Sequence, residues 1–420
     1  MRSRAARQRR DRSALRVGFF GHLGARNIGN DASLEAVLSY LRNAHPAARY
    51  DAMCPGPERV AQQYGIDAVP LYWQQRFDQR LSGAASIAAK TIGKGIDAFR
   101  TAAWVRRHDV VIVPGAGVLE ASLPLWPWGM PLALCLLSAS GRLFGAKVAF
   151  VGVGAGEIKK RPTRALSNTA ARLAYYRSYR DGGARDALAL RGVDVSGDHV
   201  YTDLAFALPE PETRNADGAT ADTVGVGVMA YFGSNDERAN AAAIHAAYVA
   251  EMKAFVLWLA DTGRKVRLFV GDTNGSDQVV VEQILADVRR KLPDLDPGFV
   301  AAEQAHTFTD VMRAMQGVSS VVAIRYHNIV CSLKLSRPTI SISYSPKHDA
   351  LMAETGLADF CQPVSELTAA KLIDQFQELQ KRTPELGQTM RARNAERAEL
   401  IRMQFAELSD RLFANEDAHE

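Results

Sequence analysis

The residue types best suited to chemistry in this chain stand together at Arg325-Tyr326-His327. They follow the apolar run 318–324, which predicts a buried strand, and ligands of an open α/β sheet bind beyond the carboxyl ends of its strands. An arginine can fork onto a carboxylate or phosphate, and a histidine can move a proton near neutral pH. The segment therefore predicts an anion site with a proton-transfer group.

More cationic and titratable side chains follow at the end of the next predicted strand. After a short predicted helix, residues 337–344 predict a strand that leads to Lys347 and His348. Two successive strand ends would deliver these side chains, together with Arg325 and His327, to one rim that suits a multiply charged anion. A structural alternative stays open, in which the arginine pairs with a core carboxylate and the histidine satisfies a helix start.

This order of segments resembles the C-terminal signature of polysaccharide pyruvyl transferases. The signature is a hydrophobic strand, Arg-Tyr-His, a helix, and then Arg-Pro-Thr-Ile-Ser-Ile-Ser-Tyr-Ser-Pro-Lys, which here occupies residues 337–347. Three earlier segments resemble the same family in the same order: residues 26–34, where Arg26 stands at a usual glycine, the glycine-rich turn 111–117, and the arginine-aspartate element 179–181. Together the matches span residues 17 to about 360.

The resemblance implies an activity and a set of partners. Phosphoenolpyruvate would be the donor and a saccharide with two suitably placed hydroxyls the acceptor, giving a pyruvate ketal and phosphate during polysaccharide, for example exopolysaccharide, or glycoconjugate biosynthesis. Phosphoenolpyruvate enters as a co-substrate, and no cofactor is implied. Whether the acceptor is lipid-linked stays open.

The resemblance also suggests roles for residues of this sequence. Arg325 would hold the donor with Arg180, Lys347 and Tyr344, and His327 would protonate or relay a proton in catalysis. An internal ion pair of Arg180 with Asp181 or Asp203 is the structural alternative.

Three glycine-bearing turns follow predicted strands, at 21–30, 114–120 and 152–156, and they favour a cleft along one edge of a sheet. Five residues of these turns are candidates to face that cleft or to contact the acceptor, and Asp272 of the second half is a sixth. The five are Asn27, Asn30, Asp31, Gly115 and Gly117. Structural alternatives explain these residues as well. They are helix capping by Asn30 or Asp31, tight packing at the glycines, and an Asx turn at Asp272 or Asp277, which could otherwise contact sugar hydroxyls.

Charge and cysteine usage exclude several classes. Six arginines against one aspartate in residues 1–12 equal the whole net charge of +5, so residues 1–14 predict a disordered basic tail and no specific nucleic-acid partner. The four cysteines form no CxxC pair, and no His/Asp/Glu cluster has metal-ligand spacing, so no metal site is predicted. Residues 15–21 are too short and too charged for a secretory signal, so a cytoplasmic location is expected.

One segment tests the expectation of a cytoplasmic protein. Residues 121–141 hold no charged side chain and are long enough to reach across a bilayer, but three prolines break the first half. A buried helix after an aromatic loop is the preferred interpretation. A peripheral contact with the inner face of the plasma membrane stays open, because tryptophans favour interfaces.

Predicted strands and helices alternate along the chain, which is typical of parallel sheets covered by helices on both faces. We predict two Rossmann-like domains facing one cleft, a layout that resembles the GT-B glycosyltransferases. The predicted boundaries are an N-terminal domain at 15–208, a polar linker at 209–221, a C-terminal domain with the donor motif at 222–365, and amphipathic C-terminal helices at 366–420 that pack across the domains or on another subunit. Residues 73–107 show no clear pattern.

Two other function classes remain open. A GT-B glycosyltransferase would direct Arg325 and Lys347 at a nucleotide diphosphate. A noncatalytic anion- or glycan-binding protein would keep the arginines without depending on His327.

Overall fold

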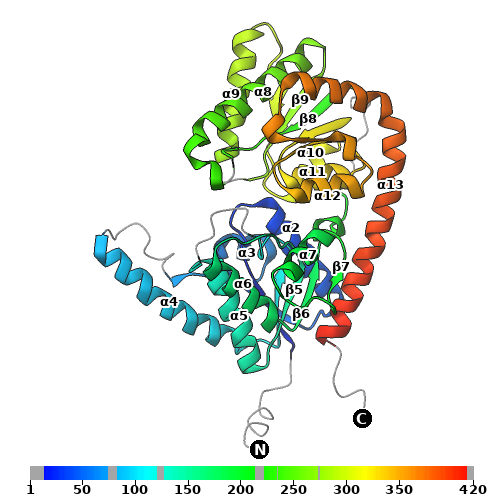
Figure 1. Ribbon diagram of the computed structural model, residues 1–420. Coiled ribbons are helices and arrows are strands. Elements are labelled where there is room, and N and C mark those ends of the chain that lie inside the picture. The colour runs from blue at the N-terminus through cyan, green and yellow to red at the C-terminus, as the bar shows by residue number, and fades with distance from the viewer. Residues whose placement is uncertain are drawn as a thin grey trace, which may run out of the picture.

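The computed structural model describes residues 14–73, 83–120, 127–212, 222–233, 235–272 and 275–413, and they form two α/β domains one above the other (Figure 1). In the first domain the parallel strand order is β3-β2-β1-β4-β5-β6-β7. In chain order these strands are β1 (Arg16–Phe20), β2 (Arg49–Cys54), β3 (Asp67–Pro70), β4 (Val110–Pro114), β5 (Lys147–Val153), β6 (Tyr176–Tyr179) and β7 (His199–Val200).

The second domain repeats this plan with the parallel order β10-β9-β8-β11-β12-β13. In chain order its strands are β8 (Thr223–Gly227), β9 (Lys265–Phe269), β10 (Val300–Ala302), β11 (Ser320–Ala323), β12 (Thr339–Ser343) and β13 (Cys361–Pro363). In each sheet the first strands are added toward one edge and the later strands toward the other. The switch lies between β1 and β4 in the first sheet and between β8 and β11 in the second. Such a switch point opens a crevice at the carboxyl ends of the strands.

Helices cover both sheets, as is usual for parallel sheets. In the first domain they are α2 (Ile28–Ala44), α3 (Pro57–Tyr64), α4 (Gly83–Val105), α5 (Met130–Phe144), α6 (Arg161–Leu173), α7 (Gly182–Leu190) and the 3₁₀ turn η3 (Leu204–Ala207). In the second they are η4 (Asn235–Asn240), α8 (Ala241–Asp261), α9 (Ser276–Lys291), α10 (Phe308–Met315), α11 (Tyr326–Lys334), α12 (Pro346–Glu354), η5 (Ala358–Phe360) and η6 (Val364–Glu366).

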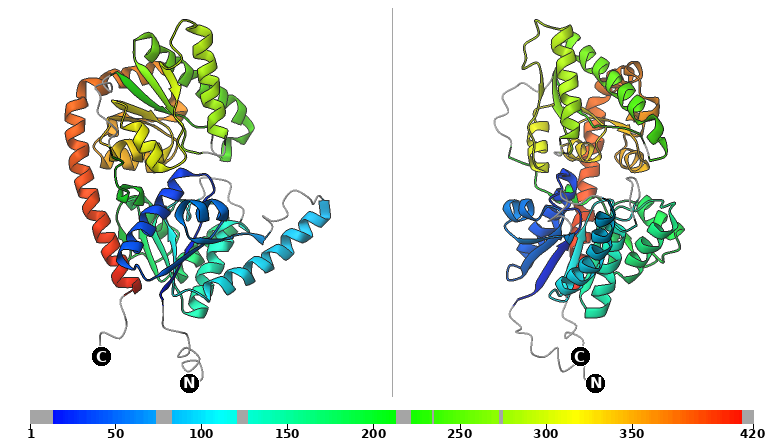
Figure 2. Two further views of the ribbon diagram at one scale, coloured as in Figure 1. Left: turned by 180° about the vertical axis from the view of Figure 1, so that it is seen from behind. Right: turned by 90° about the vertical axis from the view of Figure 1, so that its left-hand side faces the viewer.

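The last helix, α13 (Ala369–Phe413), runs from the second domain back along the first (Figure 2). Several helices were predicted here, but one helix continues through Pro384. The Asn394 amide donates to the carbonyls of Leu333 and Lys334, while the Tyr40 hydroxyl donates to the Phe405 carbonyl. The helix is therefore bonded to both domains, which explains why it stays continuous.

Two predictions about local structure are wrong for identifiable reasons. The region 73–107, which showed no pattern, contains α4, whose Ile92 and Phe99 face outward while Asp97 is buried. The apolar residues of α4 thus recur on its exposed face and not on its buried one. The sequence of residues 163–177 predicts one continuous helix, but α6 ends at Leu173 and the β-favouring aromatics that follow form β6.

One described helix, α8, is long and apolar enough to cross a membrane by length and composition. Its buried side chains, among them Met252 and Phe255, belong to the core of the second domain. The apolar segment 121–141, considered above, contains the start of the shorter helix α5, and its residues 121–126 lie outside the described residues.

Candidate functional site

The carboxyl edges of the two sheets meet where α2 and α11 begin. The ring of His327, in the first turn of α11, packs directly on Gly29, in the first turn of α2, and a Cβ at Gly29 would lie 2.0 Å from that ring. Beside this contact the backbones of Asn27 and Asp272 form an isolated antiparallel bridge. The N-terminal motif and the Arg-Tyr-His motif, about three hundred residues apart, are therefore in contact across the domain interface.

Arg325 lies at the N-terminus of α11 and is held by a carboxylate of its own domain. Its Nε and Nη2 donate to Asp277 at 2.8 and 2.7 Å, and the Asp277 side chain is fully buried and also accepts from the Ala230 amide. This is the core-carboxylate pairing anticipated as the structural alternative. It orients the guanidinium, and Nη1 makes no hydrogen bond with any described residue. Although burial opposes it, the bonds to Asp277 raise the pKa of Arg325.

Tyr326 lies close to two cations from different domains. The Arg180 guanidinium lies 4.9 Å from the Tyr326 ring centroid, and the Lys347 ammonium lies 5.5 Å from it. Arg180 follows β6 in the first domain, while Lys347 lies in the first turn of α12 in the second. The structure thus places Arg180, Arg325, Lys347 and His327 at one interface, and their binding of a donor stays a prediction.

The Arg180 guanidinium is almost completely buried, with 2% of its side chain exposed, yet none of the described residues accepts a hydrogen bond from it. Three carboxylates surround it at longer range: Asp181 at 3.5 Å, Asp203 at 3.7 Å and Glu120 at 3.9 Å. These carboxylates include the partners named in the structural alternative. A buried donor normally finds a partner at about 2.9 Å. Arg180 is therefore neutralised in charge but unsatisfied in hydrogen bonding.

Glu120 connects the two cations, because it also accepts from Lys347 at 3.3 Å. Gly117 and Gly154 make room for this arrangement, since a Cβ would lie 1.9 Å from the Glu120 carboxylate at the first and 2.6 Å from the Arg180 guanidinium at the second. Gly115, with a φ of 54°, packs against Ser33 instead. The glycine turns thus position charged side chains as well as backbone.

His327 is electrically neutral in this arrangement. Burial lowers its pKa to about 4, and the charges of Arg180, Lys347 and Arg325 act in the same direction while Asp203 opposes them. Neither ring nitrogen hydrogen-bonds to a described residue, and the ring meets Tyr326 edge-on at 5.3 Å. The imidazole is held by packing and keeps both nitrogens for a ligand.

His348 is not at the rim, contrary to the prediction. Its side chain is fully buried between the carbonyls of Ser345 and Ile324, 3.1 Å from each, and burial lowers its pKa to about 3. Tyr344 directly follows β12, and its ring is tilted by 59° to the His348 ring with the centroids 4.5 Å apart. Tyr344 stays partly exposed, and its ring centroid lies 5.9 Å from the Lys347 ammonium. The sequence could not distinguish the outward from the inward residue at the start of α12.

The residue that caps α2 is Asn27, so the alternative in which Asn30 or Asp31 caps this helix is wrong. The Asn27 side chain accepts from the amides of Gly29 and Asn30, so α2 begins at Ile28. The side-chain amide of Asn30 donates to the His22 carbonyl, and Asn30 stays partly exposed. Its neighbour Asp31 points inward.

Asp31 shapes the turn that leads into α2. Its side chain is buried and accepts from the Gly24 amide at 2.7 Å, and burial raises its pKa to about 6. Arg26 has a φ of 66°, a left-handed conformation that explains why glycine is usual there. Asp272 meets Asn27 through backbone, whereas Asp277, the other aspartate considered as a sugar contact, is committed to Arg325.

Two important residues, Tyr326 and Glu120, were not assigned a role from sequence, and Asp277 was considered only for a sugar contact or an Asx turn. Tyr326 stands between two residues that were singled out, so its place in the motif was the available signal. Glu120 follows a glycine turn, and only the three-dimensional structure brings it to Lys347. Within the described residues no group of three His, Cys, Asp or Glu side chains could hold a metal ion.

Comparison with known proteins agrees with this geometry. The family model described as polysaccharide pyruvyl transferase matches residues 27–346, which include the capped loop, Arg180 and the whole Arg325 to Pro346 segment. The chain belongs to the polysaccharide pyruvyl transferase family. Among the curated proteins compared with it, none gives a significant match.

Solved structures share the two-domain architecture at low sequence identity. UDP-GlcNAc 2-epimerase from Neisseria meningitidis, bound to UDP-GlcNAc, has a TM-score of 0.61 and 10% identity over 96% of this chain and 100% of that one. The HepE protein of Anabaena in complex with UDP has a TM-score of 0.59 and 10% identity over 95% and 99%. The lipopolysaccharide outer core galactosyltransferase WaaB has a TM-score of 0.53 and 12% identity over 95% of this chain and 99% of that one. The fold is therefore that of the GT-B epimerases and glycosyltransferases, and it does not choose the reaction.

Proposed function

We propose that this transferase moves the pyruvyl group of phosphoenolpyruvate onto two hydroxyls of a saccharide, releasing phosphate, in polysaccharide or glycoconjugate biosynthesis. The observation that carries the proposal is the buried Arg180 guanidinium, which lies close to the Tyr326 ring, as the Lys347 ammonium does, and donates no hydrogen bond to a described residue. A small dianionic or trianionic ligand would supply those bonds. Phosphoenolpyruvate has the required carboxylate and phosphate on one short carbon frame.

The residues divide the donor between the domains. In the proposed complex Nη1 of Arg325 donates to one anionic group of phosphoenolpyruvate, while Asp277 keeps the Arg325 guanidinium oriented. Arg180, from the first domain, binds the other anionic group. Lys347 exchanges Glu120 for the donor. The N-termini of α2, α11 and α12 meet at the same place, and their dipoles favour negative charge.

His327 moves the proton in this proposal. As a neutral imidazole it takes the proton of the first attacking hydroxyl and passes it to the methylene carbon, which becomes a methyl group. The hydroxyl oxygen bonds to C2, and the C2–O bond to phosphate then breaks. The second hydroxyl adds to C2 and its proton leaves with phosphate, which completes the ketal. Arg180, Arg325 and Lys347 stabilise the charge on the departing phosphate.

The acceptor would enter from the first domain, where Asn30 is partly exposed beside the Gly29 to His327 contact. Asn27 and Asp272 close the same side through their backbone bridge. Loosening of that bridge would admit the saccharide, as expected of a domain-closure enzyme. The proposal implies that the reaction takes place where phosphoenolpyruvate is available, in the cytoplasm.

The test is phosphate release from phosphoenolpyruvate by the purified full-length protein with free and lipid-linked saccharides. Acceptor-dependent release is expected in the wild type, and His327→Ala should abolish it while phosphoenolpyruvate still stabilises the variant against heat. Arg185→Ala, an exposed arginine paired with Asp186, is the matched control and should remain active.

Two results would contradict the proposal. Thermal stabilisation by nucleotide sugars and none by phosphoenolpyruvate would indicate glycosyl transfer. Binding of phosphoenolpyruvate with no release for any acceptor, and with no effect of His327→Ala, would indicate a noncatalytic binding protein.

A further inference from the structure

Helix α4 carries its apolar residues on the outside of the molecule. Ile92, Ile96, Phe99 and Ala103 recur at spacings of four, three and four residues, which places them on one face, here called the outer stripe. Ile92 is 63% exposed and Phe99 76% exposed, while Ile96 and Ala103 are partly exposed. Figures 1 and 2 show α4 extending beyond the body of the first domain, which agrees with the high exposure of Ile92 and Phe99.

The opposite face of α4 explains why the helix is oriented this way. Asp97, Thr101 and Trp104 face inward and are buried. Asp97 accepts from the Trp73 amide at 2.6 Å and pairs with Lys94 at 3.8 Å and with Arg100. A buried polar network of this kind fixes the rotation of the helix, so the outer stripe is held outward.

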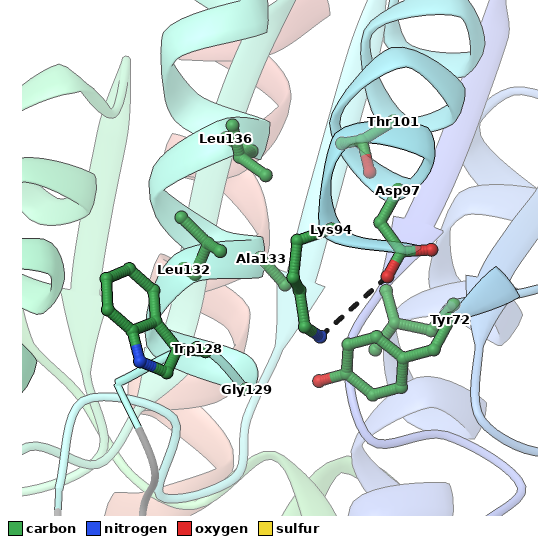
Figure 3. A pocket seen from close by; sticks show the side chains of 10 residues that line it. Tyr72, Lys94, Asp97, Thr101, Trp128, Gly129, Leu132, Ala133 and Leu136 are labelled. Atoms are coloured by element: carbon green, nitrogen blue, oxygen red, sulfur yellow. Dashed lines mark ion pairs between the residues drawn. The ribbon is translucent and has the colours of Figure 1, made fainter. Parts of the chain in front are cut away.

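A small pocket separates α4 from α5 next to this network (Figure 3). Lys94 and Asp97 line it from α4, and Leu132 and Leu136 line it from α5, with Trp128 at its edge. Trp128 is 60% exposed. An exposed tryptophan therefore lies close to a helix that already exposes isoleucine and phenylalanine.

The charge of this region has one sign. Residues 83–107 contain Lys90, Lys94, Arg100, Arg106 and Arg107 against the single acid Asp97, which is buried. Lys94 and Arg100 pair with Asp97, whereas Arg106 and Arg107 are exposed directly after the helix. An outer stripe of apolar side chains followed by two exposed arginines complements a surface that is apolar inside and anionic outside.

We propose that the outer stripe of α4, with Trp128, docks this protein on an anionic lipid bilayer. The helix would lie in the plane of the interface, with Phe99 and Ile92 inserted at the level of the headgroups. A second copy of this chain is a poorer occupant, because a symmetric pairing of two stripes would offer no exposed acid from residues 83–107 to Arg106 and Arg107 of either copy. The inference is independent of the reaction proposed above.

The test is co-sedimentation of the full-length protein with vesicles of phosphatidylcholine alone and of phosphatidylcholine mixed with phosphatidylglycerol. Wild type should pellet with the mixed vesicles only, and less as salt rises, since exposed charges are screened. The variant Ile92→Ser/Phe99→Ser should bind about tenfold less or weaker still, because two large apolar side chains no longer enter the interface. Leu190→Ser/Val279→Ser removes equally exposed apolar side chains elsewhere and should bind like wild type.

All four substitutions are at exposed positions, so thermal melting should be unchanged and loss of folding can be excluded directly. Equal pelleting of wild type and Ile92→Ser/Phe99→Ser would overturn the proposal. So would binding that depends only on the arginines of residues 1–12, which replacement of those six arginines by serine would reveal. A dimer in sedimentation that dissociates only in Ile92→Ser/Phe99→Ser, without vesicle binding, would assign the stripe to a second copy and also overturn it.

Discussion

Gly29→Ala is the substitution that bears most directly on how the two domains form one site. Gly29 has no unusual backbone conformation, and alanine in the first turn of α2 favours the helix by up to about 1 kcal/mol. The new Cβ would nevertheless lie 2.0 Å from the His327 ring, where ordinary contact begins at 3.4 Å. The ring, or the whole second domain, must therefore retreat by about 1.4 Å.

That displacement sets the size of the expected effect. A misplacement of about 1 Å at a reacting group costs roughly a hundredfold in rate, or about 2.7 kcal/mol of transition-state stabilisation. We expect kcat to fall about a hundredfold while the melting temperature stays unchanged or rises slightly. The loss should be in kcat more than in the affinity for donor, because Arg325 remains paired with Asp277.

The assay is steady-state phosphate release, together with donor titration by calorimetry. Gly182→Ala is the matched control, since Gly182 also lies in the first turn of a helix and a Cβ there would meet nothing within 4 Å. Full activity of Gly29→Ala would refute the reasoning, because it would mean that the working enzyme does not hold His327 on α2.

Three further predictions follow from the charges of the site. Glu120→Gln should bind phosphoenolpyruvate about fivefold more tightly in calorimetry, because the donor no longer competes with a carboxylate for Lys347 at a gain of about 1 kcal/mol; weaker binding would contradict this role. Burial raises the pKa of Asp31 to about 6 in the folded protein, so the protonated carboxyl favours folding fully below the pKa of the unfolded chain. This contribution to the free energy of unfolding is lost as the pH rises through 6. Asp31→Asn should therefore raise the free energy of unfolding by about 2 kcal/mol at pH 8 and not at pH 4, measured with denaturant; an equal change at both pH values would refute the assignment. Because the pKa of His327 is lowered to about 4, kcat/KM corrected for donor titration should stay constant from pH 8 to about 5 and fall only below that; a midpoint near 6.5 would show that the imidazole is not desolvated before the donor binds.

The architecture and the identity of the charged residues could be predicted from the sequence because each depends on local patterns. Apolar strands followed by helices define two parallel sheets, and the strand end before Arg325 places that residue at the carboxyl edge. Arg180 and Lys347 follow from the same rule applied to β6 and β12. Their convergence at one interface depended on a resemblance to a family, since spacing alone does not place one sheet against the other.

What could not be predicted depends on which side of a turn faces inward. His348 is buried and Lys347 reaches the site, although the two are neighbours in the first turn of α12. Asn27 rather than Asn30 caps α2 because only its side chain reaches the free amides of the first turn. The inverted helix α4 was not recognised because its apolar residues recur on the exposed face, while its buried face is polar and holds Asp97.

The most direct measurement of the central claim uses phosphoenolpyruvate labelled with carbon-13 at C2. After incubation with enzyme and a saccharide acceptor, the account predicts that the label appears as a quaternary ketal carbon attached to the sugar, with an equal amount of phosphate, and that neither forms with His327→Ala. Label that stays in phosphoenolpyruvate for every acceptor, or that appears only as free pyruvate, would contradict pyruvyl transfer.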